Sequence, residues 1–168
     1  MSGLRALALA AALSATAGLG ACGFTPLYAE TGVAQGLSRI AISAPDSRFG
    51  FVLRGQLEDA FAVDGSHEPL WRLTTEVEQT RRPLGRRIDD TASRYEVTAV
   101  VRYALTTAGG EPTLADAVTA VTTYAVADQP YAGITAQEDA EERLAAEAAR
   151  LIRIDLSRRL AASVPARP

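Results

Sequence analysis

Residues 94–107, with the sequence Arg-Tyr-Glu-Val-Thr-Ala-Val-Val-Arg-Tyr-Ala-Leu-Thr-Thr, form the clearest strand pattern in the chain. Alternate positions carry the side chains expected to face a core: Tyr95, Val97, Ala99, Val101, Tyr103 and Leu105. A period of two predicts a half-buried β-strand, because successive side chains of a strand point to opposite faces of its sheet. The intervening residues, such as Arg102, should then face water.

The residues that follow predict a hairpin. Gly109-Gly110 is a turn signal, and Glu111-Pro112 prolongs the turn. Residues 113–126 are rich in Val, Thr and Tyr, which favours a strand that pairs back on residues 94–107. On the other side, residues 69–79 also alternate, and their apolar positions include Trp71, Leu73 and Val77. Three long strands in series predict an antiparallel meander.

Two helices and one short strand complete the expected fold. Residues 37–43 alternate well enough for a short strand, and residues 48–63 place apolar side chains at the spacing of one helical face, with Asp46 as the N-cap. The last helix should begin at Thr135, where Glu138 completes a capping box. Its apolar face comprises Ala145, Ala148, Ala149, Ile152, Leu156 and Leu160. Asp155 lies beside that face and is expected to form a surface ion pair with Arg158 or Arg159.

The predicted fold class is therefore α+β. It is a two-layer sandwich in which a four-stranded, mainly antiparallel sheet carries two helices on one face, in the order β-α-β-β-β-α. Residues 37–164 form this single domain, which is large enough to build an ordinary apolar core.

The N-terminus has the pattern of an export signal. Arg5 precedes an apolar segment from residue 6 to 19, and Leu19-Gly20-Ala21-Cys22 follows. These four residues resemble a bacterial lipobox, which implies a signal peptide over residues 1–21, N-acyl and S-diacylglycerol groups on Cys22, and a lipidated tether over residues 22–36. Several acyl chains would give a stable anchor. An ordinary signal peptide followed by a chance cysteine is the alternative. The residue after the lipidated cysteine is Gly23 and not an aspartate. In sorting of the enterobacterial kind, the absence of an aspartate here favours passage to the outer membrane.

Composition excludes several classes of protein. The chain has 17 basic and 20 acidic residues, a net charge of −3, so a nucleic-acid binder is not expected. Its single cysteine allows no internal disulfide. No metal-ligand cluster or phosphate-binding loop is present, and the only histidine, His67, lies in a turn next to Ser66. No cofactor and no enzymatic activity are therefore expected.

An arginine-rich segment is the candidate binding site. Residues 79–88 contain Arg81, Arg82, Arg86 and Arg87 without any acidic residue, and Pro83 and Gly85 predict that this segment is a loop between strands. Guanidinium groups bind phosphates and carboxylates in a bidentate manner. The segment could therefore bind the anionic head group of a glycolipid or an acidic partner surface. Alternatively, it is a solvated loop whose charge maintains solubility.

The chain resembles the LptE family of lipopolysaccharide-assembly lipoproteins. The resemblance rests on Cys22-Gly23-Phe24 and Pro26-Leu27-Tyr28, on the element order with its long hairpin, and on the segment Tyr-Ala-Val-Ala-Asp at residues 124–128. It implies a protein anchored in the outer membrane on its periplasmic side and seated in the lumen of the LptD β-barrel. There it would act as a plug and assembly partner and would bind lipopolysaccharide.

Two alternatives remain open from the residues themselves. The chain could be a periplasm-facing lipoprotein that scaffolds another envelope complex, or one that binds a small ligand on the free face of its sheet. Copurification of a large β-barrel would distinguish the plug hypothesis from both.

Overall fold

A computed structural model describes residues 37–86, 92–126 and 129–163. The elements in order are β1 (Ile40–Ser43), α3 (Arg48–Phe61), β2 (Trp71–Arg86), β3 (Ala92–Thr107), β4 (Pro112–Ala125) and α4 (Pro130–Ser163). The signal peptide, the tether with Cys22, and Arg87 lie outside the described residues. The expectations about them therefore stay predictions.

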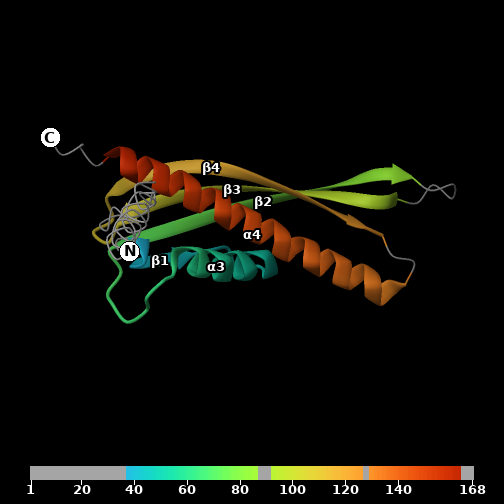
Figure 1. The fold of residues 1–168 in the computed structure, drawn as a ribbon, viewed down its shortest axis with the longest axis horizontal. Helices are drawn as coiled ribbons and strands as arrows, with labels where there is room; N and C mark the ends of the chain where they lie inside the picture. Colours follow the sequence, from blue (N-terminus) through green and yellow to red (C-terminus); the bar gives the residue numbers. More distant parts are fainter. Residues whose placement is uncertain (1–36, 87–91, 127–128, 164–168) are drawn as a thin grey trace, which may run out of the picture. The chain divides into compact units, whose positions relative to one another are not determined.

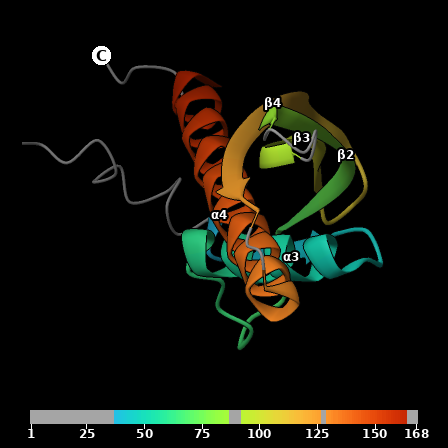
Figure 2. The same cartoon turned by 90° about the vertical axis from the view of Figure 1, so that its right-hand side faces the viewer.

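The four strands form one sheet in the order β1-β2-β3-β4. Strand β1 runs parallel to β2, whereas the β2–β3 and β3–β4 pairs are antiparallel. Helices α3 and α4 cover one face of this sheet, and α4 crosses it diagonally (Figures 1 and 2). The predicted α+β sandwich and its β-α-β-β-β-α order are confirmed.

The alternation along β3 is also as predicted. Val101 and Leu105 are completely buried, and Tyr103 is nearly so, whereas Arg102 between them is exposed. Val101 lies opposite Val77 of β2 and Val118 of β4, so the same face is apolar across three strands. This face receives the two helices.

Helix α3 begins at Arg48, as predicted, but its N-cap lies one residue later than predicted. Ser47, not Asp46, is the N-cap, because its extended backbone directly precedes the first helical turn and its hydroxyl accepts a 3.0 Å hydrogen bond from the Gly50 amide. The helix ends at Phe61, two residues before the predicted end. Ala62 follows in the left-handed conformation, with φ of 49°, and closes the helix.

Helix α4 begins five residues earlier than predicted. Its first residue is Pro130, whose restricted φ and missing N–H are compatible with the first helical position. Thr135 therefore lies inside the helix, and its hydroxyl donates to the Tyr131 carbonyl at 3.1 Å instead of capping the N-terminus. Over the described parts of the chain, neither helix combines the length and apolar character that crossing a membrane requires.

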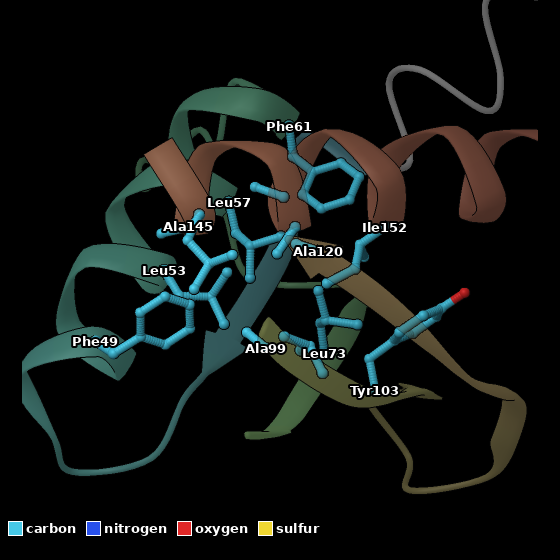
Figure 3. Close-up of a cluster of buried hydrophobic side chains, with 14 of the residues drawn as sticks. Phe49, Leu53, Leu57, Phe61, Leu73, Ala99, Tyr103, Ala120, Ala145 and Ile152 are labelled. Atoms are coloured by element: carbon cyan, nitrogen blue, oxygen red, sulfur yellow. The ribbon is translucent and has the colours of Figure 1, made fainter. Parts of the chain in front are cut away.

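The core lies between the helices and the sheet (Figure 3). Helix α3 contributes one apolar stripe, and α4 contributes mainly alanines, which allow its backbone to approach the sheet closely. The buried hydrophobic residues of the two helices are Phe49, Leu53, Leu57, Phe61, Ala140, Leu144, Ala145, Ala148, Ala149, Ile152 and Leu156.

Candidate functional site

The arginine-rich segment is not a loop over its described residues 79–86, and for them that prediction is wrong. Strand β2 continues through these residues to Arg86, and each of them except Gly85 is paired with a residue of β3. Strand β1 pairs only with residues 71–74, so β2 has a free edge beyond that point. The Ala108 amide donates to the Leu70 carbonyl, so the even-numbered residues of β2 direct their backbone groups toward β3 and the odd-numbered residues direct theirs toward the free edge. The N–H that Pro83 lacks would therefore face the free edge and not β3. Proline is therefore tolerated here, because no ladder hydrogen bond is lost.

Gly85 also fits the strand for a local reason. Its φ is +71°, a conformation that residues with a side chain rarely adopt. A Cβ atom at this position would lie 2.9 Å from the Ser93 hydroxyl. The glycine allows the hairpin to continue from the Leu84–Arg94 pair to the Arg86–Ala92 pair.

Arg81 lies in a cluster with two tyrosines, which we call the Arg81–tyrosine cluster: Arg81, Tyr95 and Tyr124. The guanidinium carbon lies 4.7 Å from the centre of the Tyr95 ring, a cation–π geometry. One guanidinium nitrogen donates to the Tyr124 hydroxyl at 3.3 Å, and the two tyrosine rings are 5.6 Å apart. Because Arg81 is exposed while Tyr124 is buried, the cluster holds a cation in place at the surface.

Arg82 does not join this cluster. Alternation sends its side chain to the opposite face of β2, where it forms a 2.6 Å ion pair with Glu96 of β3. The backbone of Arg86 lies in the strand, and Arg87 lies outside the described residues. The structure thus separates Arg81 from Arg82 and brings Arg81 to Tyr95 and Tyr124. Tyr95 and Tyr124 occupy alternate strand positions whose side chains point to the buried face of the sheet. Only the register of the three strands places them beside Arg81.

A second polar group joins α4 to the sheet. The Tyr103 hydroxyl of β3 donates to the Asp155 carboxylate of α4, and Arg159 donates to Asp155 at 2.8 Å and also pairs with Asp116 of β4. Burial, and then the hydrogen bond to Asp155, hold the pKa of Tyr103 above its ordinary value. The predicted Asp155–Arg159 pair is present. It is part of a larger network that connects three elements.

The turn around His67 holds a serine, a histidine and an aspartate, yet it lacks the geometry of a catalytic triad. The Ser66 hydroxyl and the Asp64 carboxylate both approach the same ring nitrogen of His67, Nδ1, each at 2.9 Å. In a catalytic triad, the serine and the aspartate contact opposite ring nitrogens of the histidine. Bonds from the Ser66 hydroxyl and amide lower the pKa of Asp64 to about 2. No group of side chains suited to a metal ion occurs in the part of the chain that the structure describes.

The free face of the sheet carries a hollow of about 490 Å³. Its lining combines small side chains, one tyrosine and three charged groups: Thr74, Glu76, Arg102, Tyr103, Ala104, Ala115, Asp116 and Ala117. Its volume is in the range of small-molecule sites, about 300–1,000 Å³. The hollow is wide open to solvent, and it lies on the face that the small-ligand alternative would use.

The family model described as "LptE: Lipopolysaccharide-assembly" matches residues 37–156. The chain belongs to the LptE family. The match covers the four strands, α3 and α4 as far as Leu156. It includes the Arg81–tyrosine cluster, Tyr103 and Asp155, but not Arg159. The resemblance noted in the sequence is thereby confirmed. No match is found among curated proteins.

Three solved structures of lipoproteins are similar to this chain. A candidate lipoprotein from Caulobacter crescentus CB15 is 41% identical, with a TM-score of 0.70 over 80% of this chain and 99% of that chain. The minor lipoprotein from Acinetobacter baumannii is 13% identical, with a TM-score of 0.59 over 74% of this chain and 93% of that chain. Rare lipoprotein B from Shewanella oneidensis is 16% identical, with a TM-score of 0.54 over 74% of this chain and 98% of that chain. The last two share the fold.

Proposed function

We propose that this chain is a non-enzymatic lipopolysaccharide-assembly lipoprotein that forms the plug and assembly partner of the LptD β-barrel. The observation that carries the proposal is the match of the LptE family over residues 37–156. The Caulobacter protein, 41% identical and described as a candidate lipoprotein, supports an envelope location.

The chain also binds lipopolysaccharide in this proposal, and the Arg81–tyrosine cluster is the part of the described structure that supports it. Arg81 stays exposed while Tyr95 and Tyr124 restrict its motion, so less side-chain entropy is lost when an anion binds. Guanidinium groups suit the phosphates of a lipid head group. Arg86 and Arg87 follow in the sequence, whereas Arg82 is already neutralised by Glu96.

The anchor belongs to the same proposal. Cys22 carries N-acyl and S-diacylglycerol groups after removal of residues 1–21, and residues 22–36 tether the domain to the outer membrane on its periplasmic side. More than one acyl chain makes such an anchor stable.

Copurification tests the partner. The full-length lipoprotein with a C-terminal tag, expressed in its own bacterium and extracted in detergent, should recover the LptD barrel in comparable amount. Cells without the tagged protein provide the background. Recovery of a different envelope complex would contradict the proposal and favour the scaffold alternative.

Titration with lipopolysaccharide tests the lipid site. Arg81→Gln should weaken binding and reduce its dependence on salt, because exposed charges are screened within about 8–10 Å at physiological ionic strength. Arg82→Gln is the matched control: it removes one charge at the neighbouring position on the opposite face, where Glu96 already pairs with it. Combined changes of Arg81, Arg86 and Arg87 to Gln should have a larger effect than Arg81→Gln alone.

A charge-matched variant guards against a general electrostatic effect. It replaces three exposed arginines distant in sequence from the cluster, Arg54, Arg72 and Arg158, by Gln. If the variant with Arg81, Arg86 and Arg87 changed to Gln binds lipopolysaccharide as well as this control does, Arg81 would be assigned to solubility or to the barrel contact. Loss of barrel recovery with intact lipid binding would select the barrel contact.

A further inference from the structure

Besides the outer side of the four-residue strand β1, the described sheet has two longer free edges, and they differ in character. On β2, the edge beyond β1 carries charged side chains and a proline, among them Glu76, Glu78, Arg81 and Pro83. Such residues prevent other strands from pairing with an edge. On β4, residues 117–125 contain no charged side chain and are rich in Val, Thr and Ala. Of these two edges, only the β4 edge retains the features of a strand that can be extended.

The backbone groups on the β4 edge belong to its odd-numbered residues. The Val126 amide donates to the Ser93 carbonyl of β3, which assigns the even-numbered positions to the inner ladder. Two side chains that bond to odd-numbered positions agree with this assignment. Asp116 Oδ1 accepts from the Ala117 amide at 2.7 Å, and Arg143 of α4 donates to the Thr123 carbonyl at 3.5 Å.

These two side chains cover the ends of the edge and leave its centre open. Within the described residues, no hydrogen bond reaches the outward N–H and C=O groups of Thr119 and Val121. Val121 is also one of the exposed large apolar side chains, with 52% of its surface accessible. The centre of the edge therefore offers unpaired main-chain groups beside an apolar side chain.

We propose that the β4 edge at residues 119–123 binds an extended segment of the barrel partner as a fifth strand. Main-chain donors and acceptors at two-residue spacing match another β-strand, and pairing of this kind gives affinity through the backbone. The partner segment should carry small or β-branched residues and no charge opposite Val121, because the β4 edge offers no charge to pair with. This inference rests on the proposed partnership with LptD.

Amide hydrogen exchange of the full-length lipoprotein, free in detergent and in its copurified barrel complex, tests the proposal. Peptides covering residues 118–124 should exchange about tenfold more slowly in the complex at the three outward amides, since each gains a hydrogen bond. Peptides covering the β2 edge at residues 76–81 should not change at their outward amides. A complex without protection at residues 118–124 overturns the inference and leaves the proposed function standing.

Two further outcomes are also decisive. If the LptD barrel does not copurify with the lipoprotein, the proposed partnership and this inference are overturned together. Protection of the same amides in the free protein at high concentration would identify a second copy of the chain as the occupant, and so overturns the assignment to the barrel.

Proline substitutions give an independent test. Val121→Pro removes an outward N–H that has no partner in the free protein, so the unfolding midpoint should stay close to that of the wild type while barrel recovery falls about tenfold. Val121→Thr keeps the N–H, and Gln79→Pro removes an outward N–H from the β2 edge, so both should retain the barrel. Equal recovery for all three variants overturns the inference.

Discussion

Neighbouring residues of β3 differ sharply in exposure because strand alternation sends them to opposite faces. Val101 is completely buried under the helices, whereas Arg102 is exposed and lies 3.6 Å from Glu78. Substitutions at these two positions compare burial with surface charge at almost the same point of the chain.

Val101→Asp should destabilise the domain by about 3 kcal/mol or more, because an unpaired carboxylate would be buried among apolar side chains. Arg102→Asp should cost at most about 1 kcal/mol, since it removes only an exposed ion pair. Urea unfolding of the soluble domain measures both. Equal losses would mean that the register of β3 is shifted by one residue.

Replacing two glycines of α3 by alanine should change the stability of the domain in opposite directions. A Cβ atom at Gly50 would lie 2.1 Å from the Pro45 carbonyl oxygen, so Gly50→Ala must displace the backbone before the helix and should cost about 2 kcal/mol. Nothing lies within 4 Å of a Cβ atom at Gly55, and Gly55→Ala should stabilise by about 0.5–1 kcal/mol through helix propensity. Thermal unfolding distinguishes them, and a stabilising Gly50→Ala would contradict the geometry of this turn.

At the scale of elements, α4 is held to the sheet in two ways. Its alanines pack closely against the strands, and its C-terminal half is bonded to β3 and β4 through Asp155 and Arg159. Burial of Tyr103 beneath this network means that the tyrosine stays protonated in the folded protein at a pH where the unfolded chain begins to lose the proton.

Tyr103→Phe should therefore change how stability depends on pH. Because the folded pKa is raised, the stabilisation is fully present below the unfolded pKa of about 10 and is lost as the pH rises above it. The wild type should lose stability faster than Tyr103→Phe above about pH 10. Below this pH, the variant should be less stable by about 1 kcal/mol, the value of the lost hydrogen bond. Parallel pH profiles for the two proteins would contradict the role of this tyrosine.

At the scale of the whole molecule, the described domain and the predicted anchor have separate roles. The first described core residue is Leu37, and all the described strands and helices lie within residues 37–163. Membrane attachment should therefore depend on Cys22, and folding should not.

Cys22→Ala should leave the precursor uncut by the lipoprotein peptidase and unlabelled by radioactive palmitate. The soluble chain from residue 24 onward should nevertheless show the same unfolding midpoint as the lipidated protein in detergent. Normal palmitate labelling of Cys22→Ala would contradict the lipobox assignment, whereas failure of the soluble chain to fold would mean that the tether contributes to the core.

The sequence by itself determined the order of the elements, the apolar faces of β2 and β3 and the family, because periodicity and short motifs are local properties of the chain. The alternation from Tyr95 to Leu105 needed no knowledge of any neighbouring strand. Its errors at the helix N-termini were also local. Asp46 was predicted as the N-cap of α3 in place of its neighbour Ser47, and the capping box at Thr135 predicted a later start than Pro130, where α4 begins.

Tertiary structure alone decided the form of the arginine-rich segment. Pro83 appeared to end a strand, yet whether a missing N–H matters depends on which strand lies beside it, and β1 is too short to reach that position. The partners of Arg81, Arg82 and Asp155 likewise depend on the register between strands and on where α4 crosses them. Contacts between residues 14 to 52 positions apart are set by packing of the whole domain, since no local pattern encodes which distant side chains meet.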